Sequence, residues 1–457
     1  MGWLKRVKAV LASEPETWLV YIYGQKFESL KYLQDAEPRY KGWYLRLSVW
    51  GYSLLRSIRL KPGSSPMQCE YLVFSGTINQ KNSLETTLTE LRKRKMNVCA
   101  IAPKTIINRW DIKSQNYEAM GYSPLEIFKC AFLCLLRAKR LRTQLKEKNG
   151  VLTRNRLDIF LNVYSDLVYF DTLLKKTKPK TVIVSNDHNT SNRALIALAR
   201  NAGVKTVYMQ HASVSKLFPA LNVDYAFLDG ESALETYRLC EENRPEGSMP
   251  IKNRAVFLTG QKKNLNTAPS KNKGSQSVGV ALNALDSIEG VKILTQVLSE
   301  NKMTVRLRWH PALSSQMIDK LKLNLRGFNV DFSDPKKESL GGFFSHIDCM
   351  VAGNSSIHLE AALSHVVPIH YEMNTKNIED YYGYVKNGLS LNEESIEDLL
   401  ETIQRIKRGE LKINKRATKF YSSTFGTEWE GREGELVSET LLSLQKNLEP
   451  PVSAINL

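Results

Sequence analysis

From Tyr71 onward, short apolar runs alternate with longer amphipathic segments. The runs that have the length and composition of buried strands lie at 71–76, 97–103, 181–187, 205–211 and 224–228. The segments with apolar residues at helical spacing lie at 83–95, 128–145, 156–174 and 192–203, and Gly203 stands where a helix commonly ends. The pattern predicts an α/β half in which strands and helices alternate.

The same pattern begins again after a polar stretch at 241–277 that is rich in Pro, Gly, Asn and Lys. The strands expected there lie at 277–283, 304–311, 346–354 and 366–372, and the helices at 288–302 and 355–366. Two such halves predict an α/β fold of two Rossmann-like domains facing across a cleft. Because ligands of doubly wound sheets bind at the carboxyl ends of strands, polar residues that follow strands become the candidates for a site.

The changes in pattern also predict the limits of the domains. They are a helical N-terminal segment rich in aromatic and basic residues at 1–65, a first Rossmann-like domain at 66–255, a linker at 256–277, a second Rossmann-like domain at 278–425, and a C-terminal helix and tail at 426–457. A length of 457 residues allows two domains, each with its own core.

The net charge of +17 indicates an anionic partner, either nucleic acid, anionic lipid or a phosphorylated substrate. Since no nucleic-acid recognition motif is present, we expect no nucleic-acid partner. The six cysteines never reach C-x-x-C spacing, which argues against a zinc site and a disulfide framework and favours a reducing, cytoplasmic location. No secretory signal and no apolar run of membrane-spanning length is expected.

The aromatic and basic segment at 1–65 allows two interpretations. Its Tyr/Trp-Leu-Arg patterns are typical of amphipathic helices that lie on a membrane surface. Equally, such helices could pack on the first domain. Together with the basic charge, the first interpretation predicts an anionic membrane surface as a partner and a peripheral position at the inner face of the cytoplasmic membrane.

In the first half, polar residues follow two neighbouring strands. Asn186, Asp187 and His188 end one strand, while Gln210 and His211 end the next. Adjacent parallel strands would bring these side chains to one rim, where Asp187 could act as a base or nucleophile and His211 could position it or stabilise charge. Capping of the following helix is the structural alternative for Asp187.

In the second half, alternation along 304–311 places Arg306, Arg308 and His310 on one side of a strand that Pro311 ends. An imidazole there can donate to a phosphate oxygen. A second motif reads AGNSSIHLEAAL, in which Gly353 permits close approach and Asn354, Ser355 and Ser356 open a helix.

Backbone N–H groups and hydroxyls at such a helix start suit an anionic phosphate, although plain capping also explains the serines. One turn further, Glu360 could accept from ribose hydroxyls. Since no D-x-D pair occurs, we expect no metal and no cofactor; the helix start, the serines, His310 and basic residues would hold the phosphate instead.

The motifs RWHP at 308–311 and NSSIHLEAA at 354–362 resemble the HP and SS motifs of bacterial sialyltransferases, polysialyltransferases and Kdo transferases of the GT-B fold. The resemblance covers roughly residues 275–390 and implies that His310, Ser355 and Ser356 bind the CMP part of a CMP-sugar donor. The first half is similar to capsule and lipopolysaccharide transferases, through SNDH at 185–188 and MQHAS at 209–213.

The first half departs from sialyltransferases, whose acidic D/E-D/E-G motif follows an early strand. Here the early strand runs into SGTINQ, and the nearest acidic match, at 229–231, comes late in the domain. This shifts the expectation from sialic acid towards Kdo or a related acidic sugar, transferred to a glycan or lipid-linked acceptor. The first domain would then bind the acceptor and the second the nucleotide sugar.

Three alternatives stay open. Non-hydrolysing UDP-N-acetylglucosamine 2-epimerases share the architecture and a serine-rich helix start, and CDP-glycerol-type polyol phosphotransferases also use paired histidines and a cytidine nucleotide. A non-catalytic scaffold of a polysaccharide-assembly complex would bind no nucleotide.

Overall fold

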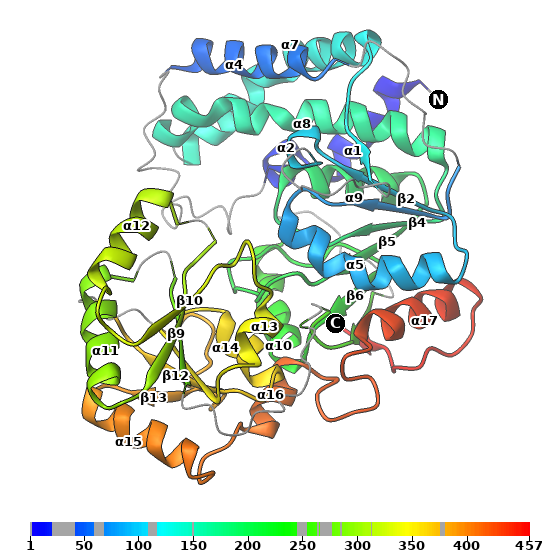
Figure 1. The fold of residues 1–457 in the computed structure, drawn as a ribbon. Coiled ribbons are helices and arrows are strands. Elements are labelled where there is room, and N and C mark those ends of the chain that lie inside the picture. The colour runs from blue at the N-terminus through cyan, green and yellow to red at the C-terminus, as the bar shows by residue number, and fades with distance from the viewer. Residues whose placement is uncertain are drawn as a thin grey trace. The chain divides into compact units, whose positions relative to one another are not determined.

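The structure is a computed structural model, and it describes residues 2–20, 42–58, 68–107, 117–148, 150–244, 254–262, 265, 277–283, 286–311, 313–374 and 380–457. Its contacts divide the chain into two compact units, Met1–Lys262 with Gly431–Leu457, and Lys263–Glu430 (Figure 1). Much of the predicted N-terminal segment, at 21–41 and 59–65, and most of the predicted linker, at 263–264 and 266–276, lie outside the described residues.

The first unit is built on an eight-stranded sheet with the order β14-β7-β6-β5-β4-β1-β2-β3. Its strands are β1 Tyr71–Phe74, β2 Val98–Ala102, β3 Glu118–Ala119, β4 Thr181–Val184, β5 Lys205–Met209, β6 Tyr225–Leu228, β7 Ala255–Leu258 and β14 Ile455–Asn456. All pair in parallel except β14, which runs antiparallel to β7. The fully buried strand residues explain the continuous apolar runs of the sequence.

Alternate residues of these strands enter two different helix layers. On one side, Leu72, Val182 and Tyr208 pack against helices α1 Trp3–Ser13, α4 Trp43–Arg56, α7 Pro124–Lys148, α8 Gly150–Thr177, α9 Thr190–Asn201 and α10 Glu231–Cys240. On the other side, Tyr71 and Val73 pack against α5 Ile78–Lys93 and α17 Glu433–Gln445. The first unit is therefore a three-layer α/β structure, to which the C-terminal helix returns.

Short elements complete the first unit, namely α2 Glu16–Leu19, α6 Lys104–Ile107 and the 3-10 turn η3 Glu241–Asn243. The described N-terminal helices α1 and α4 bury Val7, Val10, Trp50 and Leu54 in the core of this unit. Packing on the first domain, one of the two interpretations of 1–65, thus holds for one face of each helix.

The second unit has a parallel six-stranded sheet with the order β10-β9-β8-β11-β12-β13. Its strands are β8 Ser277–Ala281, β9 Thr304–Arg308, β10 Val330–Ser333, β11 Cys349–Ala352, β12 Val367–Tyr371 and β13 Leu391–Glu393. Its helices are α11 Ile288–Glu300, α12 Ser315–Asn324, α13 Leu340–Phe344, α14 Ile357–Leu363, α15 Ile396–Lys407 and α16 Lys415–Tyr421. Helices α11, α12 and α15 pack on one face of the sheet, and α13 and α14 on the other.

The predicted α/β fold of two Rossmann-like halves is confirmed, and two local expectations need correction. Residues 256–258, placed at the start of the predicted linker, belong to strand β7 Ala255–Leu258, which pairs with β6 and buries Val256 and Phe257. The helix expected to open at 354–356 begins at Ile357, with Ser356 in the N-cap position. In the described part of the chain, no helix is long and apolar enough to cross a bilayer.

Candidate functional site

The first unit gathers polar residues at the carboxyl ends of β4 and β5, as the sequence predicts. Val184 of β4 lies opposite Tyr208 of β5, so the residues that follow the two strands meet at one edge of the sheet. The two histidine rings that follow these strands, His188 and His211, lie with their centroids 6.1 Å apart and their planes 25° apart. This edge is the rim that the sequence pattern predicts.

Asp187 is buried and both of its carboxylate oxygens are engaged. Tyr237 of α10 donates its hydroxyl to Asp187 Oδ2 at 2.6 Å, and His188 Nδ1 lies 3.0 Å from Asp187 Oδ1. The backbone carbonyl of Asp187 accepts from Arg193 Nη1 at 3.0 Å. Helix α9 is capped by Asn189, whose side chain accepts from the Asn192 N–H, so Asp187 does not serve as the cap.

The contacts of Asn186 orient the ring of His188. Asn186 Oδ1 accepts from the backbone N–H groups of His188 and Asn189, both at 2.9 Å, so its Nδ2 faces His188 Nε2 at 3.1 Å. An amide NH₂ only donates, hence Nε2 carries the lone pair and Nδ1–H points at Asp187. Both ring nitrogens of His188 therefore have partners within the protein.

His188 in turn supports the aromatic wall of the rim. Its ring packs on Phe218 at a centroid distance of 4.2 Å. The ring of His211 is half-buried on the other side of the rim. The rim therefore combines the Asp187–His188 contact with the neighbouring rings of His188, His211 and Phe218.

Gln210 connects the strand ends instead of facing a ligand. Its Oε1 accepts from the Asp229 N–H at 2.8 Å, and its Nε2 donates to the Ala212 carbonyl at 3.1 Å. Asp229, the acidic residue that opens the 229–231 match, forms a buried ion pair with Lys262 Nζ at 3.0 Å. Gln210 and the Asp229–Lys262 ion pair therefore stabilise this edge of the sheet.

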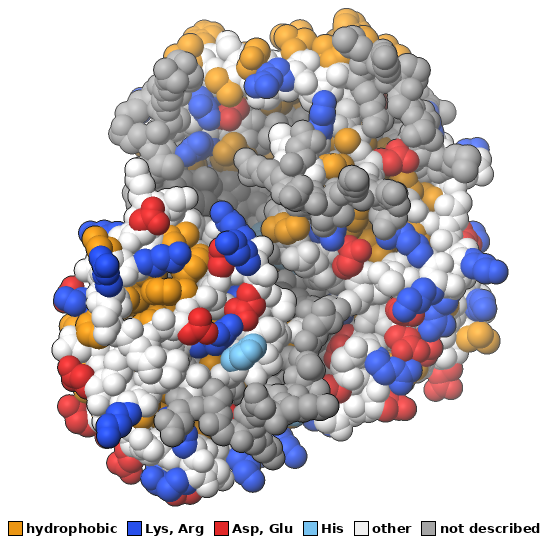
Figure 2. All heavy atoms as spheres, in the orientation of Figure 1, with side chains coloured by type: hydrophobic (Ala, Val, Ile, Leu, Met, Phe, Trp, Pro, Cys, Tyr) orange, Lys and Arg blue, Asp and Glu red, His pale blue; other side chains and the backbone are white. Residues whose placement is uncertain are grey.

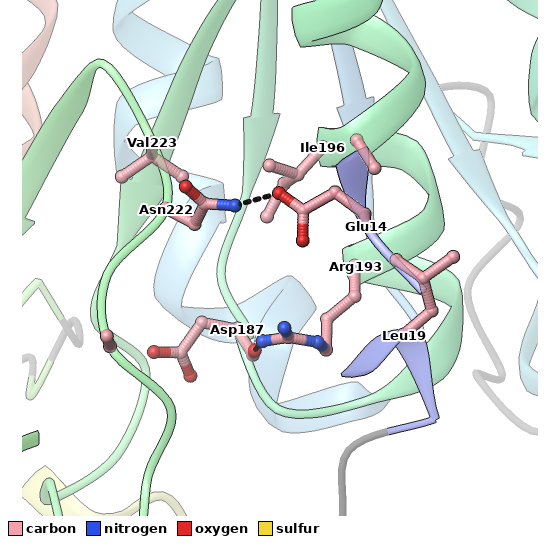
Figure 3. A pocket seen from close by; sticks show the side chains of 9 residues that line it. Glu14, Leu19, Asp187, Arg193, Ile196, Asn222 and Val223 are labelled. Carbon is pink, nitrogen blue, oxygen red and sulfur yellow. Dashed lines mark hydrogen bonds between the residues drawn. The ribbon is translucent and has the colours of Figure 1, made fainter. Parts of the chain in front are cut away.

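A small pocket lies beside Asp187, lined from α1, α2, α9 and the loop before β6 (Figure 3). Its lining residues are Glu14, Leu19, Asp187, Arg193, Ile196, Ala197, Ala220, Asn222 and Val223. Figure 3 shows Asn222 hydrogen-bonded to Glu14 on one side and the Arg193 guanidinium against the Asp187 backbone on the other. Apart from Asp187, the lining residues were not identified from the sequence, and neither were Tyr237 and Phe218, because no local motif marks them.

In the second unit, the ends of β8, β11 and β12 meet around Gly353. A methyl group on Gly353 would lie 3.2 Å from Asp286 Oδ1, 3.4 Å from Glu372 Oε1 and 3.5 Å from Asn283 Nδ2. A Cβ atom here would be tight only against Asp286 Oδ1, so Gly353 gives these three polar side chains room. The close approach of the Gly353 backbone to a ligand stays a prediction. The rule that polar residues follow strands would have found Asp286 and Glu372, which the sequence analysis did not name.

The two carboxyl groups are not fully satisfied by the protein. Asp286 Oδ2 accepts from the Asn283 N–H at 2.7 Å, and Glu372 Oε1 accepts from Asn374 Nδ2 at 2.9 Å. Asp286 Oδ1 and Glu372 Oε2 are buried and have no hydrogen-bond partner among the residues that the structure describes. Burial, with the nearby Glu372 charge adding to it, raises the pKa of Asp286 to about 6. Such a pair suits ligand hydroxyl groups, which can both donate and accept.

The residues of the NSSIHLEAA motif border this carboxyl pair. Asn283 Nδ2 approaches the Asn354 carbonyl at 3.5 Å, and Ser355 Oγ lies 3.5 Å from the Ile357 N–H. Ser356 occupies the N-cap without a side-chain cap hydrogen bond. Capping therefore does not account for the Ser356 hydroxyl, and it accounts for the Ser355 hydroxyl only through a long contact.

Other motif residues lie further into the unit. Glu360 of α14 is buried, and His310 is half-buried directly after β9, where Pro311 follows it. His358 is buried with Nε2 2.9 Å from the Gly353 carbonyl, and burial lowers its pKa to about 4. A neutral His358 thus helps to hold the Gly353 turn.

Arg308 has intramolecular partners where the sequence suggested a phosphate. Its Nη1 donates to Ser333 Oγ at 2.7 Å and its Nη2 to the Glu338 carbonyl at 3.0 Å. Arg306 lies on the same face, as alternation predicts, and donates to Glu338 Oε1 at 2.6 Å. Both guanidinium groups therefore stabilise the β9–β10 edge.

Among the described residues, no group of three or more His, Cys, Asp or Glu side chains is arranged to hold a metal ion. The expectation of metal-free chemistry stays a prediction.

No protein-family model matches the sequence, and no curated protein matches it at the sequence level. Solved structures do match the fold. A UDP-N-acetylglucosamine 2-epimerase aligns with a TM-score of 0.51 at 13% identity, covering 86% of this chain and 100% of its own. The enzyme of that name from Neisseria meningitidis, solved with UDP-GlcNAc, gives 0.51 at 14% identity, covering 82% and 99%.

S. aureus MnaA, solved with UDP, gives a TM-score of 0.50 at 10% identity, covering 83% of this chain and 98% of that one. Sequence identities this low support a shared fold, and they do not indicate a shared reaction. The chain is therefore similar to these enzymes in its architecture, two Rossmann-like α/β units of the GT-B type.

Proposed function

We propose that the chain is a glycosyltransferase that moves a sugar from a nucleotide donor to a glycan or lipid-linked acceptor. One observation carries the proposal: around Gly353, the partly unsatisfied carboxyl groups of Asp286 and Glu372 lie beside the NSS turn. The carboxyl groups can accept hydrogen bonds from ribose hydroxyl groups, and the serine hydroxyls and backbone N–H groups can donate to a phosphate. Together they fit a ribose joined to a phosphate. In this proposal the donor phosphate is bound by His310, Asn354, Ser355 and Ser356. The ribose hydroxyl groups are bound by Asp286, Glu372 and Glu360.

The donor in this proposal is a CMP-sugar, with Kdo or a related acidic sugar as the transferred group. The support is the resemblance of 308–311 and 354–362 to the HP and SS motifs. No metal takes part; the leaving phosphate receives hydrogen bonds from the NSS turn and from His310 instead.

The first unit supplies the acceptor chemistry. We assign the role of proton acceptor to His211, which follows β5 and whose ring lies 6.1 Å from that of His188. The acceptor hydroxyl loses its proton to His211, its oxygen bonds the anomeric carbon, and the bond from that carbon to the donor phosphate breaks. Asp187 acts as a positioning residue through His188.

A mass-spectrometric transfer assay tests the proposal. The wild type is incubated separately with CMP-Kdo, CMP-sialic acid, UDP-N-acetylglucosamine and CDP-glycerol, with lipid and glycan fractions as acceptors. We expect a mass increase of the acceptor from a CMP-sugar, and its loss in His211→Ala. Transfer from CDP-glycerol alone would make the chain a polyol phosphotransferase.

The second candidate function is a UDP-N-acetylglucosamine 2-epimerase-like reaction, favoured by the fold comparisons with TM-scores of 0.50 to 0.51. Epimerisation at C2 requires removal and return of a proton, so incubation with UDP-N-acetylglucosamine in deuterated water separates the two. Deuterium at C2 would establish the epimerase; an unlabelled nucleotide sugar would exclude it.

A further inference from the structure

Helix α7 carries apolar side chains on two opposite faces, and only one of them faces the core. Cys130, Leu133, Cys134, Leu141 and Leu145 are buried against the first unit. On the solvent side, Leu125, Phe128, Phe132, Leu135 and Leu136 follow one another at helical spacing. Leu135 is 85% exposed and Phe128 68%. The core does not account for this second stripe.

Helix α4 extends the apolar surface. It runs beside α7 in the opposite direction, because Arg142 stacks on Trp43 at 4.4 Å while Ile58 bridges to Tyr122 beyond the other ends. Its solvent face exposes Tyr44, Leu45, Tyr52 and Leu55. Figure 2 shows apolar side chains gathered along the upper edge, over α4 and α7. We call these exposed residues of the two helices the α4–α7 surface.

Positive charge continues the α7 stripe directly. Lys139, Arg140, Lys146 and Lys148 are exposed in the last turns, with Glu147 as the one exposed acid of the helix from Lys139 onward. Lys129 lies 5.7 Å above the ring of Trp3 beside the apolar half. The exposed face of α7 thus passes from apolar to basic along a single helix.

We propose that the α4–α7 surface docks the protein on an anionic lipid bilayer, with the apolar side chains in the headgroup and acyl boundary and the lysines and arginines on lipid phosphates. A helix with exposed Phe and Leu next to clustered Lys and Arg has the composition of interfacial helices. A second copy of this chain would bring the same positive charge to the contact, so like charges oppose self-association. Anionic lipid complements both halves of the surface.

The test is co-sedimentation of the full chain with vesicles of phosphatidylcholine alone or with added phosphatidylglycerol. We expect binding to the anionic vesicles and a drop in the partition coefficient of at least about tenfold for the double variant Phe128→Glu with Leu135→Glu. Leu323→Glu, at a 68% exposed leucine of the second unit, is the matched control and should bind like the wild type. Lys139→Glu with Arg140→Glu should weaken binding to the anionic vesicles and lower its salt dependence.

Wild-type protein that stays in the supernatant with anionic vesicles would overturn the proposal, as would equal binding of the wild type and the double variant. Size-exclusion chromatography tests the alternative that a second copy of the chain covers the α4–α7 surface. A wild-type dimer that the double variant converts to a monomer would assign the surface to self-association instead.

Discussion

At the scale of single residues, the first unit stabilises an otherwise costly buried carboxylate through its neighbours. Asp187 is buried, yet it receives hydrogen bonds from Tyr237 and His188. A buried carboxylate without partners would cost several kcal/mol, on the order of the penalty for any unpaired buried charge. The site therefore depends on a residue that is distant in sequence, since Tyr237 lies on α10, as well as on the neighbouring His188.

Tyr237→Phe removes one hydrogen bond to this carboxylate without changing the shape of the side chain. We expect a loss of about 1–3 kcal/mol in the free energy of unfolding, because the acceptor is charged and stays buried. Chemical denaturation followed by fluorescence measures it. Tyr381→Phe, at an exposed tyrosine, should leave the value unchanged; equal stability of both variants would remove the proposed role of Tyr237.

Asp166 predicts a pH dependence of stability. Burial on α8 raises its pKa to about 7 from the ordinary 3.8, against a smaller opposing effect of the Ser191 hydrogen bond. The folded state then binds more protons than the unfolded state between these values, so this contribution to stability is full below about pH 4 and is lost as the pH rises towards 7. The lost amount is on the order of 4 kcal/mol for a shift of about three pKa units.

The variant Asp166→Asn keeps an acceptor for Ser191 and removes the titration. Denaturation at pH 5 and pH 8 should therefore show a smaller decrease in the free energy of unfolding for the variant than for the wild type. Parallel decreases in both proteins would contradict the raised pKa of Asp166.

At the scale of elements, α17 docks on α5 through a glycine. A methyl group on Gly434 would lie 2.6 Å from Thr86 Cβ and 2.7 Å from the Thr86 carbonyl carbon. Arg94 at the end of α5 also pairs with Glu439 of α17 at 2.9 Å. The close approach of the two backbones is what places a C-terminal helix on the first unit.

Gly434→Ala should separate the two helices and cost about 1–3 kcal/mol of unfolding free energy, the usual range for overpacking. Gly51→Ala in α4 is the matched control, because nothing lies within 4 Å of the added methyl group. That control should gain about 0.5–1 kcal/mol from its helical position. Differential scanning calorimetry compares the two; equal effects would mean that α17 does not depend on the close contact.

The elements also show where sequence reasoning succeeds. The apolar runs predicted β4, β5, β8 and β11 because strands buried on both faces have largely continuous apolar sequences. The rims after β4, β5 and β11 followed from the same pattern. The same pattern did not predict the roles of Tyr237, Asp286 and Glu372. Their partners come from separate elements, and no local spacing encodes such contacts. The guanidinium of Arg308 could not be assigned either, since its partner Ser333 lies on another strand.

At the scale of the whole molecule, two Rossmann-like units divide the proposed work. In the proposal, the second unit binds the hydroxyl and phosphate groups of the donor around Gly353, and the first unit contributes the His188–His211 rim. The first unit also carries the α4–α7 surface. The net charge of +17 acts at this scale, because it attracts anionic substrates and surfaces over a distance of about one Debye length, roughly 8–10 Å in physiological salt.

The measurement that tests the central claim most directly is the thermal stabilisation of the purified chain by CMP, CDP, UDP and GDP, repeated with His310→Ala and with His346→Ala as the control at an exposed histidine of the same unit. The account predicts selective stabilisation by CMP that is lost in His310→Ala and kept in His346→Ala. Preference for UDP would favour the epimerase-like reaction, and a melting temperature that no nucleotide raises would contradict a nucleotide-sugar enzyme and favour the scaffold.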